Sequence, residues 1–171
     1  MQAVTVLLGF YCNNNMCLAP NTENKVTMKK IILILCLFVV QITVAQEQEI
    51  RKSINTFFEG LHTADTIKIQ SVCDDGLKLQ SVKINKDGST SLITEESNDF
   101  YKSVAAIPRD MKIEERLLDY TIKTDGAMAH VWTPYEFYIN GSMSHKGVNS
   151  FMLYNDSGLW KIIYIIDTRR K

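Results

Sequence analysis

The dipeptide Asn140-Gly141 lies between two long segments of alternating apolar and polar residues, and it constrains the fold more than any other feature. Both residues tolerate positive φ, so Asn-Gly favours a tight turn between antiparallel strands. Two further turn signals, Asp125-Gly126 and Asp156-Ser157-Gly158, divide the C-terminal part of the chain. The pattern predicts four antiparallel strands, over residues 113–124, 127–139, 144–154 and 159–168.

Helical patterns precede these strands. Segment 47–61 places five apolar residues on one helical face: Ile50, Ile54, Phe57, Phe58 and Leu61. A short second helix through Cys73, capped by Asp65 or Thr63, a strand over 77–85 and a third helix over 95–107 follow, and Pro108 ends the third helix. This order predicts an α+β domain with its helices on one face of a curved sheet.

The N-terminal part is expected to lie outside this domain. Met28-Lys29-Lys30 precedes ten apolar residues, 31–40, and a segment that ends at Ala45, which is the order of a secretory signal peptide. The alternative is a buried core helix, and the apolar run is shorter than the roughly 20 residues of a membrane span. We expect 1–27 to be a non-native upstream extension, 28–45 a signal peptide, and 46–171 one exported domain, periplasmic or extracellular, with no stable membrane anchor.

The composition excludes some classes of function. Lys+Arg and Asp+Glu both number 19, so there is no basic excess of the kind that nucleic-acid binding requires. Only Cys73 follows residue 45, and we expect it to be buried without a disulfide partner. Three widely spaced histidines form no zinc motif, so we expect no metal and no cofactor.

Three stretches carry a resemblance to a known superfamily: residues 57–62, residues 129–138, and residues 160–164 with 167–169. Together with the element order, they resemble the nuclear transport factor 2-like superfamily (SnoaL-like cone fold) and, more narrowly, bacterial proteins labelled "putative lumazine-binding". The resemblance covers 47–171 and implies three N-terminal helices packed on a curved antiparallel sheet, and homodimers through that sheet. Such scaffolds host isomerases, dehydratases, polyketide cyclases and binding modules, so the fold does not fix the function.

Hairpin arithmetic predicts which side chains share a sheet face. A two-residue loop at Asn140-Gly141 places Glu136 opposite His145, and a three-residue loop at 156–158 places Asn149 opposite Ile165. The face that results carries His130, Trp132, Glu136, His145, Asn149, Asp167 and Arg169. We expect Pro134 to introduce a bulge, and a slip of one residue would exchange the two faces.

These residues suggest a ligand site. Glu136 beside His145 would fix its tautomer and make it a general base. Asp167 and Arg169 suit a polar or anionic ligand end, and Trp132 suits a flat ring. Tyr135 is added because it adjoins Pro134, although the register places it on the other face. The alternative is that these are cross-strand pairs that close one end of the sheet.

The sequence therefore predicts an exported small-molecule-binding domain with a cone-shaped pocket. The first alternative is a dehydratase, isomerase or cyclase that uses His145 as general base. The second is a dimeric protein-interaction module, which predicts an exposed aromatic patch around Tyr154, Trp160 and Tyr164.

Overall fold

The computed structural model describes residues 22–85 and 87–170 and divides into two compact units, up to Gln41 and from Ile42 onward. Helix α1 (Thr22–His62) contributes to both units. The predicted signal peptide falls within α1, and residues 1–21 of the predicted upstream extension lie outside the described residues. None of the described helices combines enough length with enough hydropathy to span a bilayer.

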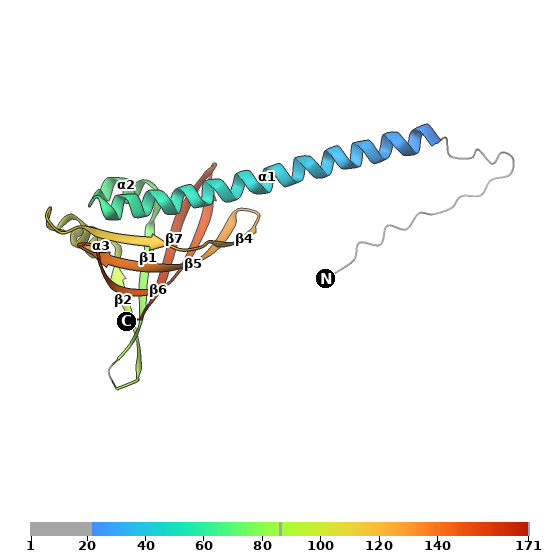
Figure 1. The fold of residues 1–171 in the computed structure, drawn as a ribbon. Helices are drawn as coiled ribbons and strands as arrows, with labels where there is room; N and C mark the ends of the chain where they lie inside the picture. Colours follow the sequence, from blue (N-terminus) through green and yellow to red (C-terminus); the bar gives the residue numbers. More distant parts are fainter. Residues whose placement is uncertain (1–21, 86, 171) are drawn as a thin grey trace. The chain divides into compact units, whose positions relative to one another are not determined.

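The second unit is an α+β domain, as predicted (Figure 1). Its other helices are α2 (Thr66–Ser71) and α3 (Ser97–Ala105). Its seven strands are β1 (Cys73–Ile84), β2 (Thr90–Glu96), β3 (Ile113–Leu117), β4 (Thr121–Asp125), β5 (Met128–Ile139), β6 (Ser142–Asp156) and β7 (Leu159–Arg170). They form one curved sheet in the order β2-β1-β7-β6-β5-β3, with β4 also paired to β5. All pairs are antiparallel except β1 with β7.

The strand list differs from the prediction at three places. Strand β1 begins at Cys73, although the second helix was expected to run through Cys73 and the strand to begin at residue 77. Strand β2 was not predicted, because its residues are mostly exposed and lack the apolar alternation of a half-buried strand. It forms a hairpin with β1 that extends beyond the other strands (Figure 1). The predicted strand 113–124 is two strands, β3 and β4, which pair with successive parts of β5.

The predicted register is correct at the first turn and wrong beyond it. Ile139 pairs with Ser142 around Asn140-Gly141, whose φ angles are 51° and 79°. A bulge then leaves Ser144 unpaired, so Phe137 faces His145 and Glu136 faces Lys146. The second turn is a two-residue loop, because Asp156 pairs with Leu159, and a second bulge places Asn149 opposite Asp167 instead of Ile165.

Pro134 introduces no bulge, which corrects the prediction. It pairs with Val148, and its carbonyl oxygen accepts a hydrogen bond from the backbone N–H of Leu118 at 2.9 Å. This edge of β5 faces the gap between the end of β3 and the start of β4. The reciprocal bond, from residue 134 to the Leu118 carbonyl oxygen, cannot form because proline has no N–H, and β3 ends one residue earlier, at Leu117.

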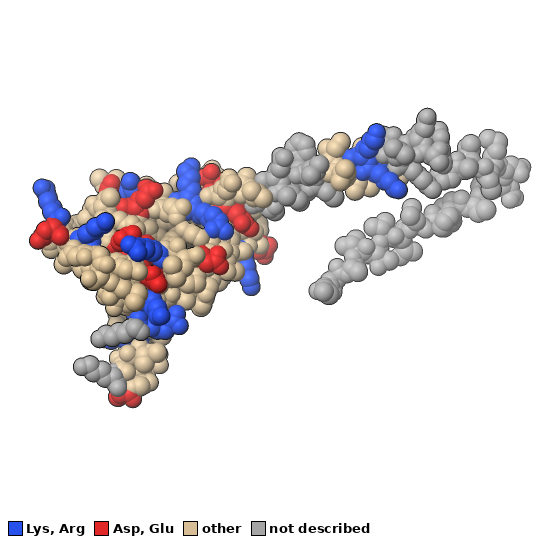
Figure 2. All heavy atoms as spheres, viewed as in Figure 1, with Lys and Arg blue, Asp and Glu red and all other residues tan. Residues whose placement is uncertain are grey.

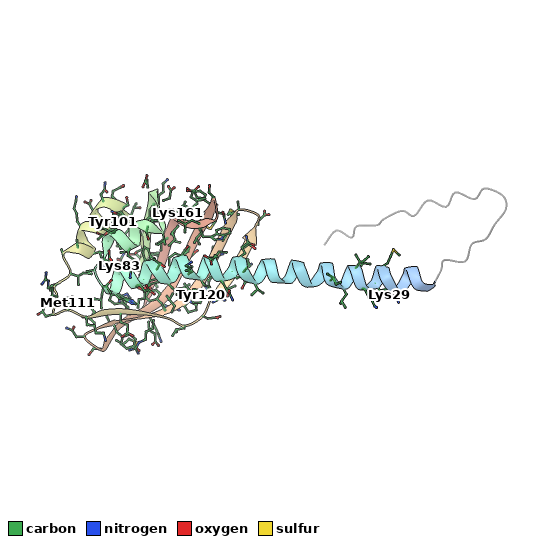
Figure 3. All side chains as sticks on the ribbon, turned by 90° about the horizontal axis from the view of Figure 1, so that it is seen from above. Lys29, Lys83, Tyr101, Met111, Tyr120 and Lys161 are labelled. Atoms are coloured by element: carbon green, nitrogen blue, oxygen red, sulfur yellow. The ribbon has the colours of Figure 1, made fainter. Side chains whose placement is uncertain are left out.

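The core lies between the helices and the concave sheet face. The predicted face of α1 supplies Ile50, Ile54, Phe57 and Phe58, all buried. Beside them, the guanidinium of Arg51 lies 4.5 Å from the ring centre of Tyr120, and Figure 3 shows Tyr120 next to α1. Trp160 is only 2% exposed and belongs to this core. The exposed aromatic patch predicted around Tyr154, Trp160 and Tyr164 is therefore wrong.

Candidate functional site

A cavity of about 1060 Å³ opens on the concave side of the sheet. Its apolar floor is lined by the rings of Phe57, Phe58, Phe100 and Phe151. Phe57 stacks on Phe100 with ring centroids 5.9 Å apart, and Phe151 meets Phe57 and Phe58 edge to face. Packing of this kind holds the rings in fixed positions, so the floor is a preformed apolar surface.

A row of polar side chains, called the polar belt below, lies two residues along the strands from the phenyl floor. Strand register aligns four side chains across β5, β6, β7 and β1: Thr133, Asn149, Asp167 and Ser81. Thr133, Asn149 and Asp167 are buried, with Asp167 only 9% exposed. Polar groups at such depth need hydrogen-bond partners, and each partner also fixes the side chain in place.

Asp167 is the centre of a hydrogen-bonded group. Its carboxylate accepts hydrogen bonds from Ser81 Oγ, from the Tyr135 hydroxyl at 3.2 Å and from Arg169 Nε at 2.9 Å. Arg169 also donates from Nη2 to Ser81 Oγ at 3.3 Å. Burial is the main cause that raises the pKa of Tyr135, followed by the charge of Asp167, so the hydroxyl stays protonated and remains a donor.

Gly147 allows this arrangement, because it is the register partner of Tyr135 on β6. A Cβ at this position would lie 1.7 Å from the Thr168 carbonyl oxygen and 2.9 Å from Cε1 of Tyr135. Only a residue without a side chain lets the tyrosine ring and β7 approach the backbone this closely.

A second carboxyl group, Glu115 on β3, reaches the belt from the edge of the sheet. Its Oε1 accepts a hydrogen bond from Asn149 Nδ2 at 2.6 Å. Its backbone N–H donates to Nε2 of His62, at the end of α1, at 2.8 Å. Burial raises the pKa of Glu115 to about 7, and the charge of Asp167 also raises it. Glu115 can therefore hold or release a proton near neutral pH.

His145 lies above the belt and stacks on Phe137 with ring centroids 4.9 Å apart. Its Nδ1 is 3.2 Å from Ser144 Oγ. Burial and the charge of Arg169 lower the pKa of His145, while Asp167 opposes them. The ring is thus mostly neutral at neutral pH and can accept a proton.

The predicted site residues separate onto two faces. Five of them line the cavity: Tyr135, His145, Asn149, Asp167 and Arg169. The other three, from β5, lie on the opposite face. There His130 contacts Ser150 Oγ at 2.9 Å, Trp132 is 46% exposed, and Glu136 accepts a hydrogen bond from the Tyr138 hydroxyl at 2.8 Å.

The predicted Glu136–His145 pair is therefore wrong. The bulge at Ser144 shifts β5 by one residue against β6, so Glu136 and His145 point to opposite faces. Tyr135, which the register had assigned away from the site, turns toward the cavity for the same reason.

Sequence reasoning missed Glu115, Ser81 and Lys83, which also line the cavity. A signal for Glu115 was present, because it lies between Ile113 and Leu117 in the alternation of a strand that turns these positions inward. A polar residue at an inward position is a candidate for a functional role. Among the described residues, no group of three or more His, Cys, Asp or Glu side chains is arranged to hold a metal ion.

Comparison with known proteins identifies the fold. No family model matches the chain, and no curated protein matches it. Among solved structures, a protein from Cytophaga hutchinsonii described as NTF2-like (nuclear transport factor 2-like) is similar, with 16% identity, a TM-score of 0.56 and coverage of 73% of this chain and 98% of the other.

Two further structures show the same likeness. A protein from Streptomyces avermitilis described as a "putative dehydratase" of the NTF2-like family is 14% identical, with a TM-score of 0.58 over 75% of this chain and 99% of the other. The association domain of CaMKII from C. elegans is 16% identical, with a TM-score of 0.55 over 72% of this chain and 95% of the other. The chain therefore has the nuclear transport factor 2-like fold, as the resemblance implied.

Proposed function

We propose that this chain, which has the nuclear transport factor 2-like fold, is an exported protein whose cone-shaped cavity binds a small, partly flat or apolar molecule. One observation carries the proposal: a cavity of about 1060 Å³ combines a floor of phenyl rings with a single buried polar belt. Ligand pockets have this composition, because apolar walls supply affinity and a few fixed polar groups orient the ligand.

The polar belt supports the proposal through its rigidity. Tyr135, Ser81 and Arg169 all donate to one carboxylate, that of Asp167. Their positions are therefore set before any ligand enters, which lowers the entropic cost of binding. The cavity-lining residues predicted from sequence, His145 and Asn149 included, are the proposed ligand contacts.

Native mass spectrometry of the protein isolated gently from its host tests this function. An excess mass that disappears on denaturation is the expected result, and its value gives the class of the ligand. A ligand-free species that also fails to bind any member of a panel of flat aromatic compounds would contradict the proposal. The narrower resemblance to "putative lumazine-binding" proteins stays a prediction, which lumazine as a panel member tests.

Export rests on the sequence pattern of residues 28–45, and N-terminal sequencing of the same sample tests it. We expect the mature chain to begin at Gln46. A chain that begins upstream of Met28 would contradict both the signal peptide and the expectation that 1–27 is a non-native upstream extension.

A second candidate function is acid–base catalysis of the dehydratase, isomerase or cyclase type. It is favoured by two groups that line one cavity: His145, which is neutral and can act as a base, and Glu115, whose pKa of about 7 suits a general acid. Glu136 has no part in it. Conversion of the recovered ligand, followed by NMR, would be abolished in His145→Gln while binding persists. If the unmodified protein does not convert the recovered ligand, the catalytic function is excluded and the binding function remains.

We also propose that two copies associate through the sheet face opposite the helices. Trp132 is 46% exposed there, and Val148, Met152 and Ile166 are partly buried neighbours by register. An exposed apolar surface of this kind favours a protein partner, and a second copy is the occupant we propose.

A further inference from the structure

Two cations lie side by side at the open end of the cavity. Lys83 on β1 and Arg169 on β7 are register partners in the parallel pair of strands, and both line the cavity. Both side chains are exposed, and Arg170 follows as a third lining cation. In Figure 2, blue side chains gather where the β1–β2 hairpin leaves the rest of the domain.

Three carboxyl groups, those of Asp167, Glu115 and Glu95, line the cavity together with its three cations, and among the described residues only Asp167 forms a salt bridge with one of these cations. Like charges on facing positions of adjacent strands repel each other. Arg169 forms a salt bridge with Asp167 at 2.9 Å, whereas Lys83 takes part in no salt bridge among the residues that the structure describes. An anion between the two side chains would relieve their repulsion.

Arg169 is also held in position for such an anion. Its Nε and Nη2 atoms donate hydrogen bonds to Asp167 and Ser81, and these two bonds fix the orientation of the guanidinium plane. Its side chain is 58% exposed, which leaves the remaining N–H groups accessible. A fixed guanidinium with free N–H groups suits the planar, two-oxygen geometry of a carboxylate.

The apolar floor lies in line with this cation pair. Ile165 contributes to the floor side of the cavity and Arg169 to its open end, on one strand and on one face. The two residues are four positions apart, which corresponds to roughly 13 Å along the strand. An elongated ligand therefore reaches both the phenyl rings and the cations.

We propose that the ligand class is an amphipathic carboxylate, with its flat or apolar part on the phenyl floor and its carboxylate between Lys83 and Arg169. The inference rests on the proposed binding function and adds the charge of the ligand to it. Partial protonation of Glu115 near neutral pH reduces the negative charge that an entering anion would meet.

Three probes of one shape test the charge preference: biphenyl-4-carboxylate, biphenyl-4-methanol and biphenyl-4-methylammonium, measured by isothermal titration calorimetry with the full chain. We expect the carboxylate to bind about tenfold more tightly than the alcohol, because a charged hydrogen bond contributes at least that factor. We expect the ammonium compound to bind most weakly.

Variants locate the effect. Lys83→Gln is expected to lower affinity for the carboxylate about tenfold and to leave affinity for the alcohol unchanged, whereas Lys83→Arg retains both. Lys123→Gln, an exposed lysine on β4 outside the cavity lining, is the matched control and should change neither.

The outcomes separate the two proposals. Equal binding of carboxylate and alcohol, or an unchanged carboxylate affinity in Lys83→Gln, overturns the cation-pair inference and leaves the binding function intact. Failure of all three probes to bind contradicts the proposed function for flat apolar ligands, and the inference fails with it.

Discussion

Oε1 of Glu115 accepts a hydrogen bond from Nδ2 of Asn149 at 2.6 Å, so a side chain from edge strand β3 reaches over β5 to β6. This contact brings a carboxyl group to the polar belt without placing it on a central strand. Because the carboxyl is taken out of water there, its pKa rises to about 7. The contact makes the stability of the domain depend on pH.

Replacing Glu115 with Gln is expected to remove this dependence. The folded state prefers the protonated carboxyl, so its contribution to stability is full below the unfolded pKa of 4.5 and is lost as the pH rises through about 7. Glu115→Gln keeps an acceptor for Asn149 and does not ionise. The difference in free energy of unfolding between Glu115→Gln and the unmodified protein should therefore change from pH 4.5 to pH 8 by up to roughly 3 kcal/mol, in favour of the variant. Urea unfolding at both pH values measures this, and a constant difference would contradict it.

His62 has the opposite dependence. Its Nε2 accepts the Glu115 backbone N–H, which only the neutral ring can do, and burial lowers its pKa below 6.5. The stability it contributes is present above pH 6.5 and is lost as the pH falls through the lowered pKa. At pH 8, His62→Phe should cost about 1–3 kcal/mol, because the N–H of Glu115 loses its acceptor. His62→Gln, which offers a carbonyl oxygen, should cost less in the same urea experiment, and equal losses would count against this role.

Much of the fold was predictable because its signals are local. The apolar face formed by Ile50, Ile54, Phe57 and Phe58, and the positive-φ turn at Asn140-Gly141, each depend on a few neighbouring residues. Strand β2 was not predictable in this way. Its residues bury little surface, and it is held by pairing with β1.

Which predicted residues reach the site depends on whether the strand register is shifted by an even or an odd number of residues, because an odd shift moves each side chain to the other face of the sheet. Loop length and bulges set that shift. The two changes in the β6–β7 pairing add up to an even shift, so His145, Asn149, Asp167 and Arg169 stay on one face as predicted. The single bulge at Ser144 shifts the β5–β6 pairing by one, which moves His130, Trp132 and Glu136 away and brings Tyr135 in. No glycine or proline marks Ser144, so no residue in the sequence indicates that bulge.

Gly147→Ala is expected to disturb both stability and binding. The new methyl group would meet the Thr168 carbonyl oxygen and the Tyr135 ring, so β7 and the tyrosine must move. We expect a loss of about 1–3 kcal/mol in the free energy of unfolding, typical of overpacking, together with weaker binding of biphenyl-4-carboxylate. Gly76→Ala is the control, because the nearest atom there is the end of the Asp74 side chain at 3.1 Å. Similar losses in both variants would show that the close approach at Gly147 is not the cause.

The proposed dimer places Trp132 at the interface between two copies. A lysine at this position would put a charge into a desolvated apolar contact, which costs several kcal/mol unless it is paired. Trp132→Lys should therefore shift the protein from dimer to monomer in sedimentation velocity runs over a range of concentrations. Ile67→Lys adds the same charge at an exposed apolar residue of α2 and should leave the dimer intact. An unmodified protein that is monomeric at every concentration, or dimers that persist in Trp132→Lys, would exclude this face as the contact.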